Sequence, residues 1–457
     1  MSATDITGAA AAAGTAPLSL NQEFVCLFDQ GSEDGPSGPR YHVVDAWRVM
    51  GAPVNADVLR DALLDVVERH EALRTRIAGP AGNRRQEILP PGPVMLDIRD
   101  FPAVPEASRA ERAEALTQDF ETETISADEA PFLRAVLARF DDRDAVLALM
   151  THHLASDALS MGVIIRDLAH RYAARTGHDV PDLPAAPQYR DFAGWQRAGA
   201  GSGTDAAREY WRRQLDGAQF TAIPTDIPRS AGLPESTAKH CFQIPGDVLS
   251  GIDRLARGSR ATRFMALAAM FQLLVHRQTG ATDVVTATFT PGRGGRLFEE
   301  TVGSFFNFLP LRTDISGCTS YRELLERTRR TCLAAFSNEI PSIHIFAQAP
   351  ELMRPAMTDN ATAVVFESVP DPDQLAEAPG DLKYVRITRR RSQPLASSVP
   401  DGALWDLNKD PSGGAVGVVS YKRNLFREDT IASMAADFGQ IARLFTSSPP
   451  PPTLRLA

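Results

Sequence analysis

The clearest hydrophobic pattern in the chain lies between Asn55 and His70, where apolar residues recur at helical spacing. The stripe consists of Val58, Leu59, Ala62, Leu63, Val66 and Val67. Asn55 precedes the first apolar turn and can accept hydrogen bonds from the free amide groups there. The pattern therefore predicts an amphipathic helix that begins after Asn55.

A second pattern changes from strand-like to helical within a few residues. Residues 145–150 (AVLALM) form a continuous apolar run, which is typical of a buried strand. After residues 151–157 (THHLASD), apolar side chains recur at helical spacing at Met161, Ile164, Ile165, Leu168 and Tyr172. We therefore expect His152 and His153 at a strand-to-helix junction, with Asp157 or Ser160 placed to cap the helix.

The second half of the chain loosely repeats this order of elements. Residues 263–278 predict a helix, and the β-branched run at residues 283–290 (DVVTATFT) predicts a strand. Residues 291–295 (PGRGG) then predict a flexible turn. The alternation of helices and strands indicates an α/β or α+β fold, and the echo between the halves hints at two related lobes.

Composition shifts divide the chain into five parts. We expect a disordered tail at residues 1–16, an N-terminal lobe at 17–183 and a linker at 184–204. A C-terminal lobe at 205–446 and a Pro-rich tail at 447–457 would follow. The linker is indicated by the Pro-rich stretch at 181–187 and the Gly-rich stretch at 198–203.

Charge and composition exclude several classes of protein. The 457 residues carry a net charge of −9, so there is no general basic field for nucleic acid. No apolar run is long enough to span a bilayer, and no signal peptide is evident, so we expect a cytoplasmic protein. The four cysteines show no close pairing. Small arginine clusters are either solvated faces or local docking patches for an acidic partner: residues 84–85, 212–213, 329–330 and 389–391.

His152 and His153 are the candidate functional residues of the chain. Because side chains alternate along a strand, one imidazole can enter a cleft while its neighbour packs behind it. A histidine can accept or hold a proton near neutral pH, as acyl transfer from a thioester requires. Asp157 has two open interpretations, an ion pair with Arg293 that locks the loop, or simple capping of the following helix.

Other kinds of site fit the sequence less well. His170 and His178 do not complete a metal-ligand set with the histidine pair, so we expect no metal. The chain contains no GxSxG elbow, no Walker loop and no GxGxxG opening a βαβ unit. The spacing HHxxxD is by itself only moderately specific.

Six segments read together resemble one family. They follow its order and extend from residue 17 to about residue 445. The segments are 17–23 (PLSLNQE), 69–75 (RHEALRT), 152–158 (HHLASDA), 189–196 (YRDFAGWQ), 302–312 (VGSFFNFLPLR) and 421–426 (YKRNLF). They resemble the motifs of nonribosomal peptide condensation domains, which belong with the chloramphenicol acetyltransferase-like acyltransferases. The chain shows no carrier-protein or adenylation signature, and in this respect it resembles the free-standing members of the family.

The resemblance implies two acyltransferase-like lobes in a V-shaped pseudo-dimer with a central tunnel. His153 would be the catalytic residue, as a base or as a positioning and intermediate-stabilising group. His152 would pack beside it, and Asp157 and Arg293 would form the family's ion pair. Residues matching tunnel regions are Ser160, Phe366, Ser368 and Trp405.

The resemblance also implies a reaction and its partners. A peptidyl carrier protein would supply the acyl or aminoacyl donor in trans on its phosphopantetheine thioester, with no cofactor bound to the chain itself. The acceptor would be an amine or a hydroxyl. Alternatives are an acyl-CoA-dependent O- or N-acyltransferase and a non-catalytic recruitment module.

One position departs from the family pattern. Ala158 stands where the family usually has glycine after the motif aspartate. Alanine carries a Cβ that restricts close backbone approach and positive φ angles. We expect Ala158 to be tolerated, because His153 and Asp157 remain. The sequence does not choose between ester and amide products, nor does it specify the donor, acceptor, stereochemistry or oligomeric state.

Overall fold

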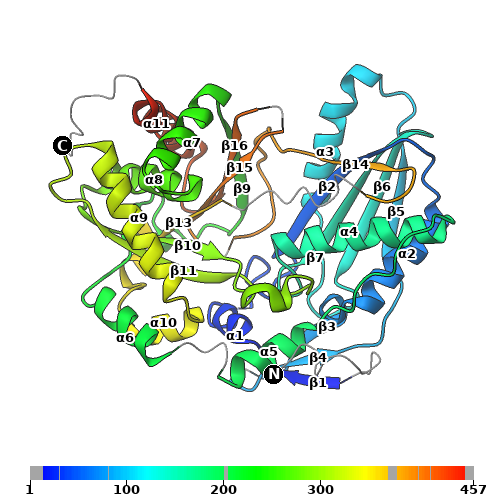
Figure 1. The fold of residues 1–457 in the computed structure, drawn as a ribbon, viewed down its shortest axis with the longest axis horizontal. Coiled ribbons are helices and arrows are strands. Elements are labelled where there is room, and N and C mark those ends of the chain that lie inside the picture. The colour runs from blue at the N-terminus through cyan, green and yellow to red at the C-terminus, as the bar shows by residue number, and fades with distance from the viewer. Residues whose placement is uncertain are drawn as a thin grey trace. The chain divides into compact units, whose positions relative to one another are not determined.

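The chain forms two compact units in the computed structural model (Figure 1). The structure describes residues 14–29, 31–80, 82–199, 204–368, 378–399, 401–411 and 413–447. Unit 1 comprises Met1–Gly201, Pro291–Phe306 and Pro372–Thr388, and unit 2 comprises Ser202–Thr290, Asn307–Asp371 and Arg389–Ala457. Two segments of the expected C-terminal lobe therefore fold with unit 1.

The predicted linker and tails have different outcomes. Within residues 184–204, the helix α5 (Tyr189–Arg197) buries Tyr189 and Phe192 in the core of unit 1. Residues 1–13 and 448–457 of the predicted tails lie outside the described residues, and so do residues 200–203 of the predicted linker. Gly14–Pro17 form the strand β1, so the expected tail ends inside a sheet.

A five-stranded sheet forms the centre of unit 1. Its order is β14 (Lys383–Arg386), β2 (His42–Met50), β7 (Asp144–His152), β6 (Leu133–Asp141) and β5 (Met95–Asp100). All neighbours are antiparallel except β5 and β6. β7 is buried along nearly its whole length, which confirms the predicted strand at residues 145–150.

Helices cover both faces of this sheet. α3 (Arg109–Glu121) packs on one face, while α2 (Ala56–Arg69) and α4 (Ala158–Arg175) pack on the other. α2 begins after Asn55, whose side-chain oxygen accepts from the amides of Asp57 and Val58, as the amphipathic pattern predicts.

Smaller elements complete unit 1. They are α1 (Leu20–Cys26), a sheet of β1, β4 (Arg85–Ile88) and β3 (Thr75–Ala78), and the 3₁₀ turns η2 (Glu71–Arg74), η3 (Glu106–Ser108) and η5 (Gly295–Phe298). α1 and α5 contribute to the network around the histidine loop.

Unit 2 is built around a six-stranded sheet. Its order is β11 (Asn307–Asp314), β10 (Asp283–Thr290), β13 (Val364–Glu367), β15 (Ala403–Lys409), β16 (Ala415–Lys422) and β9 (Thr237–Ile244). A separate pair joins β8 (Ile223–Pro224) to β12 (Ala361–Thr362). β10 has the bounds that its β-branched pattern predicts.

The helices of unit 2 pack on this sheet and on one another. They are α6 (Asp205–Gln214), α7 (Gly246–Gly258), α8 (Arg263–Thr279), α9 (Tyr321–Ser337), α10 (Ser342–Gln348) and α11 (Glu428–Thr446), with the turns η4 (Arg229–Ala231) and η6 (Arg354–Met357). α8 confirms the predicted helix at 263–278 and is buried on almost every side. An aromatic cluster of Phe271, Phe366, Trp405 and Phe438 joins α8, the sheet and α11.

The observed architecture confirms the predicted mixed α/β class. Among the helices that the structure describes, none has the length and apolar character needed to cross a membrane.

Candidate active site

The histidine pair lies at the end of β7, as the hydrophobic pattern predicts. β7 ends at His152, a short turn follows, and α4 begins at Ala158. The turn is closed by a hydrogen bond from the amide of Ala155 to the carbonyl of His152. The amide of His153 donates to the carbonyl of Tyr41, which ties the turn to the segment before β2.

His152 is a packed structural residue. Its side chain is 1% exposed, and Nε2 donates to the carbonyl of Gly38 at 3.1 Å. Nδ1 accepts from the amide of Leu154 at 3.2 Å. Burial lowers the pKa of His152 to about 3, since no carboxylate compensates a charge there. The ring is therefore neutral near pH 7, and both of its nitrogens are used.

His153 presents a different arrangement. Its half-buried ring stacks on Tyr41 at 4.8 Å between centroids and meets the edge of Phe306 at 5.0 Å. Nδ1 lies 2.9 Å from the carbonyl of Ser156, and because a carbonyl only accepts, Nδ1 carries the proton. Nε2 is then the unprotonated nitrogen, and no described residue donates a hydrogen bond to it.

Desolvation also keeps the His153 ring neutral. Burial lowers its pKa below the ordinary value of 6.5, while a hydrogen bond with its own backbone, the nearby Asp157 carboxylate and the Ser156 carbonyl act in the opposite direction. A neutral imidazole with a free Nε2 can accept a proton without first losing one. The site therefore contains a candidate general base.

Asp157 both caps α4 and forms the ion pair. Its Oδ1 accepts from the amide of Ser160 at 2.7 Å and from Nη2 of Arg293 at 2.7 Å. Its Oδ2 accepts from the amide of Phe305 at 3.2 Å. The two interpretations left open by the sequence therefore hold together, because one carboxylate can accept several hydrogen bonds.

Arg293 is buried in the same network. Its Nη1 donates to the carbonyls of Thr301 and Phe298, and its guanidinium lies 4.2 Å from the centre of the Phe305 ring. The side chains of Asp157 and Arg293 are only 8% and 7% exposed. A buried pair of this kind is sensitive to the loss of either partner, since the other charge is then left uncompensated.

Ser160 belongs to this network. Its hydroxyl donates to the carbonyl of Gly303 at 2.9 Å and accepts from the amide of Gly303 and from Arg293. The side chain is fully buried. The structure therefore gives Ser160 a positioning role, with its hydrogen-bonding capacity used.

The glycine-rich turn at residues 291–295 is tight, although the sequence suggests only that it is flexible. Gly292 has φ 60° and Gly294 has φ 64°. A Cβ at Gly292 would lie 2.0 Å from the carbonyl oxygen of Phe305, and one at Gly294 would meet the ring of Trp195. Only glycine fits both positions, and the turn then directs Arg293 toward Asp157.

Two further motif segments position Phe306 against His153. Ser19 and Gln22 form a capping box at the start of α1, and Asn21, between them in this first turn, donates from its side-chain amide to the carbonyl of Phe306 at 3.1 Å. The hydroxyl of Tyr189 lies 2.8 Å from Ser19 Oγ and donates to the carbonyl of Ser304. The segment beside the imidazole is thus held from α1 and α5.

The other predicted tunnel residues belong to unit 2, whereas His153 belongs to unit 1. Phe366 and Trp405 face each other in register on β13 and β15 and are buried in the aromatic cluster. Ser368 donates to the carbonyl of Leu407 and lines a cavity of about 210 Å³ beside the start of α8. Phe366 and Trp405 are core residues in this structure.

Sequence reasoning missed the two aromatic walls of the imidazole. Phe306 lies inside a recognised motif, so its position was available as a signal, but Tyr41 has none. Among the described residues there is no group of three or more His, Cys, Asp or Glu side chains that could hold a metal ion.

The fold and the histidine loop define a member of a known class: the chain belongs to the condensation domain family. The family model matches residues 13–452. Domains of this family are generally acyltransferases that form amide or ester bonds in nonribosomal peptide biosynthesis.

Several known proteins are similar to this chain. It is similar to SgcC5 from Streptomyces globisporus, at 45% identity and a TM-score of 0.90, covering 95% of this chain and 100% of that one. It is 31% identical to phosphinothricin tripeptide synthetase PhsC of Streptomyces viridochromogenes and 30% identical to a component of the linear gramicidin synthase of Brevibacillus parabrevis, over 95% of its length in both. The chain spans only 40% of the first of these two relatives and 8% of the second.

Proposed function

We propose that the protein transfers an acyl or aminoacyl group from a carrier-protein thioester to a hydroxyl group, forming an ester. The observation that supports this most is the imidazole of His153, with Nδ1–H directed at Ser156 and Nε2 left unprotonated. The residues that orient it are held by the buried Asp157–Arg293 pair. The recruitment-module alternative does not call for such an arrangement.

In the proposed reaction His153 takes up one proton and later gives it back. The acceptor hydroxyl donates to Nε2 of His153 while its oxygen attacks the thioester carbonyl carbon. Collapse of the tetrahedral intermediate breaks the carbon–sulfur bond, and the thiol leaves with the proton that His153 took up. The imidazole is neutral again at the end, so the products are an ester and a free thiol.

A hydroxyl acceptor is favoured by the ligand in the structure of one similar protein. The structure of SgcC5 was determined in a complex with (R)-(-)-1-(2-naphthyl)-1,2-ethanediol and sucrose. An aryl-substituted vicinal diol is therefore the acceptor class that we propose for this chain. An amine acceptor would use the same base and gives the competing product, an amide.

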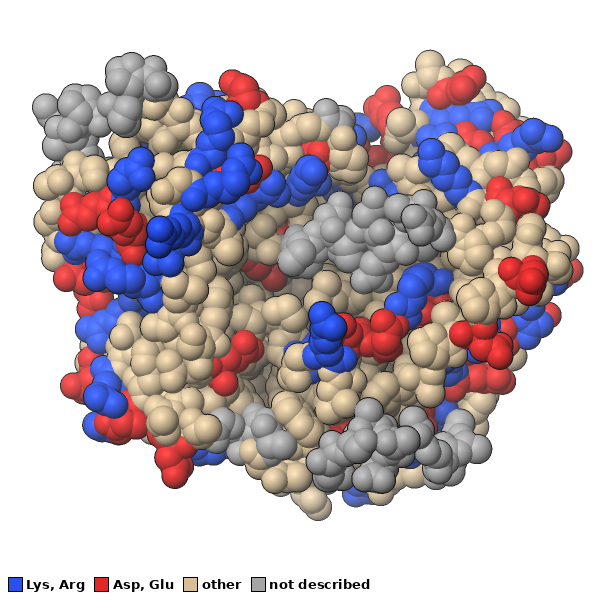
Figure 2. Space-filling view, in the orientation of Figure 1, with Lys and Arg blue, Asp and Glu red and all other residues tan. Residues whose placement is uncertain are grey.

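A carrier acting in trans is the proposed donor. The phosphopantetheine would belong to that carrier, and its phosphodiester is anionic. Lys and Arg side chains gather over the part of unit 2 that contains α7 (Figure 2). Arg254 and Arg257 are exposed on that helix. A basic surface of this kind would attract an anionic partner.

The direct test is incubation of the purified protein with an aminoacyl-loaded carrier and either an aryl-1,2-ethanediol or the matching amine. We expect an ester of the diol, identified by mass spectrometry, and a slower reaction or none with the amine. Amide formation alone would replace the proposed product class. No transfer from any loaded carrier would overturn the proposal.

A second experiment tests whether the carrier protein itself, apart from the acyl group that it carries, docks at α7. Arg254→Glu with Arg257→Glu should lower kcat/KM for the carrier-loaded donor about tenfold. The same variant should keep its rate with an aminoacyl N-acetylcysteamine thioester, which has no carrier and no phosphate. An equal loss with both donors would contradict docking at α7.

A further inference from the structure

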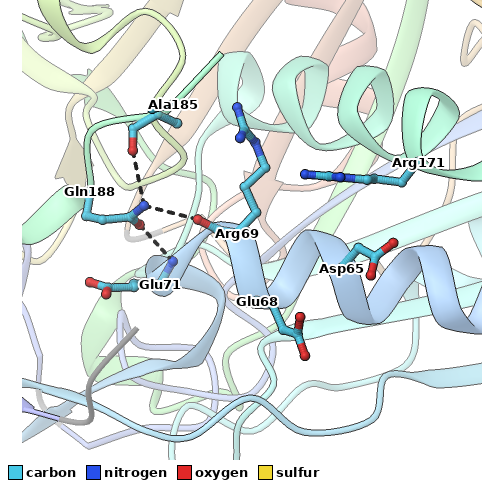
Figure 3. Close-up of a pocket in the computed structure, with 8 residues that line it drawn as sticks. Asp65, Glu68, Arg69, Glu71, Arg171, Ala185 and Gln188 are labelled. Carbon is cyan, nitrogen blue, oxygen red and sulfur yellow. Dashed lines mark hydrogen bonds between the residues drawn. The ribbon is translucent and has the colours of Figure 1, made fainter. Parts of the chain in front are cut away.

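His70 and His153, both in unit 1, differ in what can stabilise a positive charge on the ring. His70 stands in the sequence between Arg69 and Glu71, which line a cavity of about 460 Å³ bounded by α2, α4 and the segment that leads into α5 (Figure 3). Its Nε2 lies 2.9 Å from a carboxylate oxygen of the buried Asp167. A proton on His70 would therefore meet a negative charge directly.

His153 has no counter-charge of this kind. Its Nδ1–H is directed at the neutral carbonyl of Ser156. The carboxylate of Asp157 is engaged by Arg293 and by two backbone amides. In the part of the chain that the structure describes, no carboxylate forms an ion pair with the His153 ring. The proposed reaction nevertheless places a positive charge on this ring, because Nε2 takes up the proton of the acceptor.

The register of β2 and β7 brings the ring of Tyr41 onto the face of this imidazole. The two strands pair antiparallel with His42 opposite His152. Tyr41 precedes β2 and His153 follows β7, so they are opposite each other as well, and the amide of His153 donates to the carbonyl of Tyr41 at 2.9 Å. The ring centroids are 4.8 Å apart and the ring planes are inclined by only 21°.

Tyr41 is fixed in this position before any charge develops. Its amide donates to the carbonyl of Gly38 at 3.0 Å, and a Cβ at Gly38 would lie 2.1 Å from the carbonyl oxygen of Glu33, so the supporting turn is tight. Tyr41 is 3% exposed and packs against Val25 and Leu154. The aromatic face is therefore preorganised against the imidazole.

An aromatic face attracts a cation that lies within about 6 Å of the ring centroid. The imidazole of His153 lies inside that distance, and the small angle between the planes sets it against the face of the tyrosine ring. We propose that Tyr41 stabilises the protonated imidazole of His153 during acyl transfer by cation–π attraction. Tyr41 acts through His153 and is a positioning residue. This inference rests on the proposed function, in which His153 is the base.

The test replaces Tyr41 by phenylalanine and by phenylalanines that carry one, two or three ring fluorines. Fluorine withdraws electron density from the aromatic face and changes the size of the ring little. Tyr41→Phe keeps the face, so it should keep kcat within about twofold, and three fluorines should lower kcat about fivefold below Tyr41→Phe. An equal kcat along the fluorinated series would overturn the proposal. So would a loss above about tenfold in Tyr41→Phe itself, since the effect would then belong to the hydroxyl.

The pH profile separates charge stabilisation from a structural effect. A weaker attraction makes the imidazolium less stable, so the pKa of His153 should fall by about 0.7 along the series. The rising limb of kcat/KM should move to lower pH by the same amount, because the neutral ring is the active form. Asp157 with its partner Arg293, and His152, are the other charged and titratable groups beside the ring, and they are the same in every variant. A limb that stays in place or moves to higher pH would contradict cation–π attraction.

An NMR titration of the His153 ring, assigned by its absence in His153→Ala, needs neither carrier nor acceptor. A pKa that falls with fluorination while no ester forms would support the stacking and overturn the proposed function. Ester formation with a constant pKa would overturn this inference alone. The matched control places the same fluorinated rings at Phe28, which contacts Phe24 at 5.2 Å, and these should change neither kcat nor the pKa of His153.

Discussion

The turns β7–α4 in unit 1 and β16–α11 in unit 2 have the same length but different chemistry (Figure 1). β7 ends at His152 and α4 begins six residues later, and β16 ends at Lys422 and α11 begins six residues later. Both strand ends bury a basic side chain, with His152 1% and Lys422 2% exposed. The repeated strand–turn–helix supports the hint of two related lobes.

The turns differ at the next residue. In unit 1 it is His153, enclosed by Tyr41 and Phe306, and in unit 2 it is Arg423, which is exposed. The backbone turn alone therefore does not produce an enclosed imidazole. Burial lowers the pKa of the imidazole, and the aromatic side chains that contact the ring come from other segments of unit 1.

The helix caps differ as well. Asp157 caps α4 with its own side chain and also holds Arg293. Arg427 occupies the same place before α11, and there the carboxylate is supplied by Asp226, which accepts from the Arg427 amide at 2.8 Å and from the Thr430 hydroxyl. The same capping need is met locally in one unit and from a distant residue in the other.

The largest expected effect is on activity at the second position of each turn. His153→Ala should lower kcat for ester formation roughly 10²- to 10⁴-fold, because the reaction loses its proton acceptor. Arg423→Ala should change kcat less than about twofold, since an exposed surface arginine contributes little. Equal losses in the two variants, with circular dichroism confirming folded protein, would remove the distinction between the turns.

The second effect is on stability at the caps. Arg293→Ala should cost about 3–5 kcal/mol in the free energy of unfolding, because Asp157 keeps a buried charge without its partner. Arg427→Ala should cost less than about 0.5 kcal/mol, since that exposed side chain makes no capping bond. Urea unfolding measures both free energies. Similar losses would show that the buried ion pair stabilises the fold no more than the exposed Arg427 does.

The third effect concerns pH and the buried residue at the end of β7. The unfolded chain binds a proton at His152 below about pH 6.5, whereas the folded ring resists it until about pH 3. Stability should therefore fall as pH falls through this window, by roughly 1.4 kcal/mol per pH unit, or about 2 kcal/mol at pH 5.

The contribution of His152 can be separated from that of the other histidines. In His152→Asn the slope of unfolding free energy against pH between 6.5 and 4 should be shallower by about one proton. An unchanged slope would mean that His152 titrates normally in the folded protein.

The smallest expected effect is at Ala158, the first residue of α4. Ala158 is exposed, and Arg260 is the only non-glycine residue with positive φ in the described ranges, so Ala158 has an ordinary backbone conformation. Ala158→Gly should change kcat less than about twofold and cost no more than about 1 kcal/mol. A large gain in activity would show that alanine impairs this turn.

Local sequence patterns predicted the elements that depend on interactions between residues close together in the chain. The helix after Asn55, the strand Asp283–Thr290 and the His152–His153 junction depend on periodicity and capping within a few residues, and the structure confirms each. The choice between the two roles of Asp157 was not available in the sequence, since Arg293 lies 136 residues away.

Contacts between distant segments were decided only by the tertiary structure. Tyr41 and Phe306 enclose His153, Pro291–Phe306 join unit 1, and Phe366 and Trp405 pack in the core of unit 2. By itself the sequence indicated the family, the class of fold and the candidate imidazole, His153. Which side chains surround that imidazole depends on packing and desolvation, and these arise only when remote parts of the chain meet.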